Sequence, residues 1–165
     1  MSVRIHKNKK YFLSLQRLKE KTMKKAIFFS LMLLMCGTTL LGQEEKSKVQ
    51  HIDYDGFLKK IWDFEKNPNE FVFKGKTAAI VDFYADWCGP CRKVGPIMEK
   101  LANDYEGQLT VYKVNVDQAK DLASAFRISS IPAILFIPQK GQPMMQVGAM
   151  SEADYRKVIE EQLLK

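Results

Sequence analysis

Two cysteines separated by two residues are the side chains of this sequence best suited to chemistry. Cys88 and Cys91 stand in the segment DWCGPC at residues 86–91, where an apolar run gives way to a helical pattern. The N-terminus of a helix stabilises a thiolate through its free backbone N–H groups and the positive end of its dipole. We therefore expect Cys88 to be the attacking sulfur, and Cys91, one turn further in, to resolve a mixed disulfide by attacking Cys88.

Other uses of a cysteine pair fit the sequence less well. A purely structural disulfide closing so short a loop would constrain the unfolded chain little. A zinc site needs about four ligands, and beyond residue 42 the chain offers two cysteines and one histidine, His51. Haem attachment requires a histidine after the second cysteine, where this chain has Arg92. The pattern favours disulfide exchange with no metal and no organic cofactor.

The positive charge of the chain is concentrated at its N-terminus. The formal net charge is +7, but residues 1–42 hold nine of the 26 Lys and Arg residues and one of the 19 acidic residues. The rest of the chain is close to neutral, so we expect no nucleic-acid partner.

Residues 23–42 have the order of a secretory signal peptide. Lys24 and Lys25 precede an apolar stretch over 26–41, which ends at Gly42 before a polar run. We expect cleavage after Gly42 and export to the periplasm or another extracytoplasmic compartment of a bacterial envelope. The stretch is short for a membrane-spanning helix, although an uncleaved anchor is an alternative.

The processing of this leader has two further open points. We interpret residues 1–22 as a possible start-site artefact, because a start at Met23 gives a positively charged region of ordinary length. The sequence LLMC at residues 33–36 resembles a lipoprotein box, which would anchor the protein through a lipid on Cys36. Met35 fits poorly where a small residue is expected, so cleavage after Gly42 is favoured.

Residues 43–165 are enough for one domain with a core and too few for two. The polar start, 43–50, is expected to fray. Alternating strand and helix patterns predict an α/β fold with helices on both faces of a central mixed β-sheet. The predicted elements are a helix over 57–65, a strand over 78–85, a helix up to Tyr105 kinked at Pro96, a strand over 109–116, a helix from the N-cap Asp117 to Phe126, a hairpin of 133–137 with 144–147, and a last helix opened by Ser151 and Asp154.

Four segments resemble the thioredoxin family, in order and at suitable spacing, over nearly all of residues 50–165. They are 80–91, 113–117, 130–132 and 147–149. The resemblance implies a thioredoxin fold, a redox-active dithiol and a cis peptide bond between Ile131 and Pro132. It also implies protein disulfide or dithiol substrates, and a redox partner that supplies or removes electrons.

The resemblance assigns roles to two further catalytic residues. Asp82 resembles the buried family carboxylate beneath the cysteine pair, where desolvation would raise its pKa and make it a proton acceptor for Cys91. Lys113 resembles the lysine that lies near that acid. The alternative is that Asp82 and Lys113 form a purely structural ion pair.

The resemblance also implies a shallow apolar groove in which an extended substrate segment docks beside the disulfide. Trp87 could instead be a core residue, and Gly148 could serve only a tight turn. The expected substrate-binding residues are Trp87, Gly89, Pro90, Ile131, Pro132 and Gly148.

The predicted function is an extracytoplasmic thiol-disulfide oxidoreductase acting as a reductant. The Gly-Pro pair between the cysteines resembles that of reducing members and lacks the histidine of many oxidising ones, whereas a secretory leader is unexpected on a motif best known from cytosolic reductants. Two alternatives stay open: an oxidase or isomerase of exported proteins, and a redox-inert binding module. The chain also departs from the family pattern at Ala133 and in a long segment over 62–76.

Overall fold

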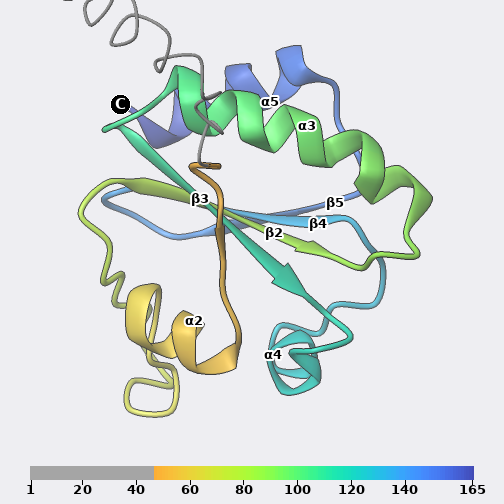
Figure 1. Ribbon diagram of the computed structural model, residues 1–165. Coiled ribbons are helices and arrows are strands. Elements are labelled where there is room, and N and C mark those ends of the chain that lie inside the picture. The colour runs from red at the N-terminus through yellow and green to blue at the C-terminus, as the bar shows by residue number, and fades with distance from the viewer. Residues whose placement is uncertain (1–46) are drawn as a thin grey trace, which may run out of the picture. The chain divides into compact units, whose positions relative to one another are not determined.

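The computed structural model describes residues 47–165 (Figure 1). The predicted leader, with its cleavage point at Gly42 and the cysteine Cys36, lies outside the described residues. The strands are β1 (Gln50–His51), β2 (Ala78–Tyr84), β3 (Leu109–Asn115), β4 (Ala133–Ile137) and β5 (Met144–Val147); the helices are α2 (Tyr54–Lys60), α3 (Gly89–Asp104), α4 (Lys120–Ala125) and α5 (Glu152–Val158), followed by the π-helical turn η1 (Ile159–Leu163).

The five strands form one mixed sheet in the order β1-β3-β2-β4-β5. β3 is parallel to both β1 and β2, β4 is antiparallel to β2, and β5 is antiparallel to β4. Figure 1 shows α3 and α5 on one face of the sheet and α2 and α4 on the other. The α/β architecture predicted from the sequence is therefore confirmed.

The central strand β2 divides the core into two apolar clusters. Its side chains alternate between the faces, so Ile80 packs with α3 and α5 while Val81 and Phe83 pack with α2 and α4. Every β2 residue except Tyr84 is buried. An apolar run without polar alternation is what a strand covered on both faces requires.

Several sequence predictions agree with the structure closely. The central strand and the hairpin of β4 and β5 have the predicted positions. α5 begins at the predicted N-cap, where the Ser151 hydroxyl accepts a hydrogen bond from the Asp154 N–H at 3.2 Å.

The first predicted helix was placed wrongly. α2 begins earlier, because the Asp53 carboxylate accepts a hydrogen bond from the Gly56 N–H at 2.8 Å, and it ends at Lys60 instead of continuing to residue 65. The aromatic residues that extended the apparent period, Trp62 and Phe64, lie in a loop and pack edge-on against each other with ring centroids 5.6 Å apart. Their spacing resembles the period of a helix, but these residues are apolar because they belong to a tertiary aromatic cluster.

Two other local predictions were also wrong. α4 begins at Lys120 with Ala119 as its N-cap, so Asp117 does not cap it. The end of the segment expected to fray is ordered, since Val49 is 5% exposed and Gln50 pairs with Tyr112 of β3. The ordering of the segment depends on a partner strand that is distant in sequence.

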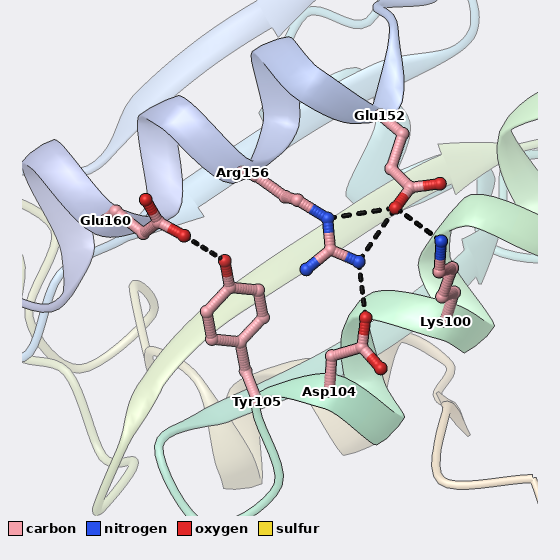
Figure 2. A network of polar contacts seen from close by, with 6 residues as sticks. All are labelled: Lys100, Asp104, Tyr105, Glu152, Arg156 and Glu160. Atoms are coloured by element: carbon pink, nitrogen blue, oxygen red, sulfur yellow. Dashed lines mark hydrogen bonds and ion pairs between the residues drawn. The ribbon is translucent and has the colours of Figure 1, made fainter.

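A polar network fastens α5 to the C-terminal half of α3 (Figure 2). Arg156 forms an ion pair with Asp104 and bonds Glu152 through its Nη2 at 2.7 Å, and Lys100 also bonds Glu152, at 2.8 Å. Beside them, the Tyr105 hydroxyl donates a hydrogen bond to Glu160 at 2.6 Å (Figure 2). These contacts set the position of α5 above the sheet.

Within residues 47–165, no helix has the length and apolar character needed to cross a membrane. In the same residues, no three His, Cys, Asp or Glu side chains group in a way that could hold a metal ion.

Candidate active site

The cysteine pair lies where β2 ends and α3 begins. Cys88 is the N-cap of α3, and its Sγ accepts a hydrogen bond from the Cys91 N–H at 3.2 Å. The two sulfurs form a disulfide of 2.03 Å, and each cysteine is 4% exposed. On reduction the Cys91 N–H and the helix dipole would stabilise a thiolate at Cys88.

The two residues between the cysteines form the first positions of α3. Gly89 is half-buried and Pro90 is exposed. Proline suits the start of a helix, because its ring fixes φ near the helical value and an N–H there would have no helical partner. Gly89 and Pro90 thus hold the turn that presents Cys88.

Asp82 is a fully buried carboxylate on the face of β2 that α3 covers. Its exposed fraction is 0%, and neither carboxylate oxygen has a hydrogen-bond partner. Burial raises the pKa of Asp82 to about 6, against a smaller opposing influence from the charge of Lys113. An acid with this pKa can accept a proton near neutral pH and return it.

Lys113 lies next to Asp82 on the neighbouring strand, since the two residues are register partners. Its ammonium group stands over the Tyr84 ring, 4.2 Å from the ring centroid. Among residues 47–165, Lys113 forms no ion pair with Asp82 within 4.0 Å. The lysine therefore acts on the acid through the electric field and not through a direct bond.

Three predicted groove residues meet beside the disulfide. Cys88 Sγ lies 3.8 Å from the carbonyl oxygen of Ile131, and the Ile131–Pro132 peptide bond is cis, as expected. The Gly148 N–H donates to the Pro132 carbonyl at 2.8 Å. Gly148 has a φ of +95°, a conformation that favours glycine, and no other group lies within 4 Å of where a Cβ would stand. The backbone therefore turns at the cis peptide bond and at Gly148, and the space beside Gly148 is free of other protein atoms.

Trp87 stands outside this cluster on the surface. Its side chain is 69% exposed, and its indole N–H donates to the Asp117 carboxylate at 2.8 Å. Trp87 is therefore not a core residue, the alternative that the sequence left open.

Sequence reasoning missed the polar residues that brace the active-site turn. Asn115 donates from its side-chain amide to the Asp86 carboxylate at 3.2 Å, and its amide oxygen accepts from the Asp117 N–H at 3.0 Å. Together with the bond from Trp87, these contacts tie the turn to the end of β3. The available signal was that Asp86 and Asn115 both stand at the carboxyl ends of adjacent parallel strands, which meet at one edge of the sheet.

Known proteins share this arrangement of sequence and fold. The thioredoxin family model matches residues 61–161, and a thioredoxin of Borreliella burgdorferi is 43% identical over 107 residues, which cover 65% of this chain and 91% of that protein. The chain belongs to the thioredoxin family.

More distant relatives of the family agree. The M-type chloroplastic thioredoxin of Pisum sativum is 33% identical over 148 residues, covering 89% of this chain and 80% of the relative. The corresponding protein of Spinacia oleracea is 37% identical over 94 residues, which cover 57% of this chain and 52% of its own. A crystal structure of chloroplastic thioredoxin z aligns with a TM-score of 0.57 at 26% identity, covering 68% of this chain and 92% of that one.

Membership of the thioredoxin family indicates thiol-disulfide oxidoreductase activity on protein disulfides. The enzyme class predicted from the sequence is therefore confirmed. The alternative of a redox-inert binding module fits this chain less well than an oxidoreductase does, because the chain is 43% identical to a thioredoxin.

Proposed function

We propose that this protein is an exported thioredoxin-family reductant, which reduces disulfides of extracytoplasmic proteins through Cys88 and Cys91. The observation that carries the proposal is the placement of Cys88 as the N-cap of α3, with the buried carboxylate of Asp82 on the face of the sheet beneath that helix. After reduction, the helix N-terminus would stabilise the Cys88 thiolate, and Asp82 would accept the proton of Cys91.

The proposed cycle balances in two steps. In the first, the Cys88 thiolate attacks a substrate disulfide, forms a mixed disulfide and releases one substrate sulfur as a thiolate. In the second, Asp82 takes the proton of Cys91, and the resulting thiolate attacks the Cys88 sulfur and releases the second substrate sulfur. The substrate gains two electrons and the protein becomes the disulfide form, which a dithiol partner must reduce again.

The groove residues supply the means of holding a protein substrate. Ile131, Pro132 and Gly148 present main-chain and apolar surface beside the disulfide, and the exposed Trp87 flanks Cys88 in sequence. Main-chain contacts of this kind accept an extended segment with little dependence on its sequence. Broad action on protein disulfides would follow.

Export rests on the leader pattern of residues 23–42, with its charged start, apolar stretch and polar continuation. Several relatives are described as chloroplastic, and that description applies to those proteins. We propose an extracytoplasmic location in a bacterial envelope, with the electron supply crossing the membrane.

The decisive test of the chemistry is trapping by Cys91→Ser. This variant keeps the attacking thiolate and lacks the resolving one, so we expect it to accumulate mixed disulfides with envelope proteins that dithiothreitol releases. The matched control, Cys88→Ser, should trap none. Equal amounts of trapped protein with both variants would contradict the assigned roles.

The direction of electron flow is tested by the reduction potential of the pair, measured by equilibration with thiol-disulfide buffers. A reductant should have a reduction potential near that of thioredoxin, about −270 mV, whereas a value above about −180 mV would support the oxidase or isomerase alternative.

The location is tested by cell fractionation and by the mass of the purified protein, which should match a chain beginning after Gly42.

A further inference from the structure

Three buried side-chain oxygens within residues 47–165 have no hydrogen-bond partner. Two are the carboxylate oxygens of Asp82 and the third is the hydroxyl of Tyr155. Both residues are 0% exposed. Leaving such groups unsatisfied is costly, so folded proteins usually pair them.

These oxygens belong to the same side of the sheet. Tyr155 projects from α5 into the cluster that also contains Ile80, Ile134 and Phe136, and its ring lies 6.2 Å from that of Phe136. The strand register connects the two sites, because Phe136 of β4 is opposite Ile80 and Ile134 is opposite Asp82. Two residues along β4, from Phe136 to Ile134, therefore lead on the same face from the surroundings of Tyr155 to those of Asp82.

Electrostatics agree with this placement. Burial raises the pKa of Tyr155, the main chain of Met150 opposes that change, and the negative charge of Asp82 raises the pKa further. A phenol that feels the charge of Asp82 keeps its proton and remains a hydrogen-bond donor.

Contacts on the outer side of α5 hold the helix that carries Tyr155. The next residue, Arg156, faces the surface and bonds Glu152 and Asp104, as Figure 2 shows. Tyr155 itself is 0% exposed and belongs to the apolar cluster on the sheet, so its side chain points inward. A phenol held in this way can donate in a defined direction.

We propose that Tyr155 donates a hydrogen bond, through one bridging water, to the carboxylate of Asp82, and that it is thereby a positioning residue for proton transfer from Cys91. This inference rests on the proposed role of Asp82 as the proton acceptor. The Cys91 proton passes to Asp82, and Tyr155 keeps its own proton. The thiolate electron pair of Cys91 forms the new bond to the Cys88 sulfur, while the bond from Cys88 to the substrate breaks and the substrate sulfur leaves as a thiolate. The three unpaired oxygens, two on Asp82 and one on Tyr155, are the polar groups that a buried water could bridge.

The test is the titration of the Asp82 carboxyl in Tyr155→Phe, followed by carbon NMR on the full chain with the disulfide intact. A hydrogen bond donated to the charged form lowers the pKa of an acid. Its loss should raise the pKa of Asp82 by about one pH unit. The matched control is Tyr112→Phe, because Tyr112 is a buried tyrosine on the opposite face of the sheet, and its removal should leave the titration unchanged.

Chemical denaturation at pH 8 gives an independent readout. If Tyr155 supports the Asp82 carboxylate, Tyr155→Phe should be destabilised when Asp82 is ionised, and this loss should vanish in an Asp82→Asn background. A Tyr155→Phe variant that is more stable than the parent at pH 8, with the Asp82 titration unmoved, would overturn the proposal, because the hydroxyl would then be unpaired.

Neither measurement uses reductase activity. A protein with the shifted titration but no reductase activity would refute the proposed function and leave the coupling of Tyr155 to Asp82 in place. The reverse result would refute the coupling alone.

Discussion

Replacing the buried acid with its amide, Asp82→Asn, should make this protein more stable at neutral pH while impairing its chemistry. The substitution keeps the shape of the side chain and removes its negative charge. Asp82 is 0% exposed and its carboxylate oxygens have no protein partner. The ionised form is therefore held in an environment that disfavours it.

The magnitude follows from the pKa of Asp82, which burial raises from 3.8 to about 6. A difference of about two pH units corresponds to about 3 kcal/mol. Since the folded state binds the Asp82 proton more tightly than the unfolded state, ionisation lowers the free energy of unfolding as the pH rises between about 4 and 6. Asp82→Asn should then gain about 3 kcal/mol above pH 6 and nothing below pH 4.

Urea unfolding of the disulfide forms at a series of pH values measures this difference. The oxidised form is used because Cys88 and Cys91 then do not titrate. In parallel, reduction of a protein disulfide should be slower in Asp82→Asn, because Cys91 has lost its proton acceptor.

The control is Asp63→Asn, at the other buried acid within residues 47–165, which is 7% exposed. Burial tends to raise the pKa of Asp63, but bonds from Lys66 and Lys74 outweigh it and lower the pKa. Its contribution to stability is present above the unfolded pKa and lost as the pH falls, so this variant should be destabilised at neutral pH. A stability gain for Asp82→Asn that does not change with pH would refute the reasoning, since a packing effect does not titrate.

Three further predictions concern packing, charge and backbone. Phe57→Ala removes a fully buried ring and should lower the free energy of unfolding by about 3–5 kcal/mol, measured by urea denaturation; a loss below 1 kcal/mol would show that the site collapses. Arg156→Ala breaks the link between α3 and α5 and should cost about 1 kcal/mol, with a smaller loss in high salt; a salt-independent loss would contradict an ionic origin. Gly148→Ala strains a backbone with a φ of +95° and should cost about 1–2 kcal/mol and raise the KM for protein disulfides. An unchanged KM would remove Gly148 from the groove.

The dithiol and the surrounding elements could be predicted from the sequence because the physics involved is local. Three features each depend on residues only a few positions apart: the place of Cys88 at the start of α3, the apolar run of β2 and the Ser151 cap of α5. The same holds for the anomaly of Asp82, since one acid in an apolar strand is visible without coordinates. Its burial was expected from this pattern, and its raised pKa from the resemblance to the thioredoxin family.

The tertiary structure alone decided what meets across the sheet. The bracing of Trp87 by Asp117 joins residues 30 positions apart, and Tyr155 reaches the side of the sheet that carries Asp82 only because α5 lies on it. The aromatic residues Trp62 and Phe64 misled the helix prediction for the same reason, because their partners include Phe126 from a distant part of the chain. Periodicity reports which side chains are buried, while the identity of their partners depends on strand order and helix placement, which no short stretch of sequence encodes.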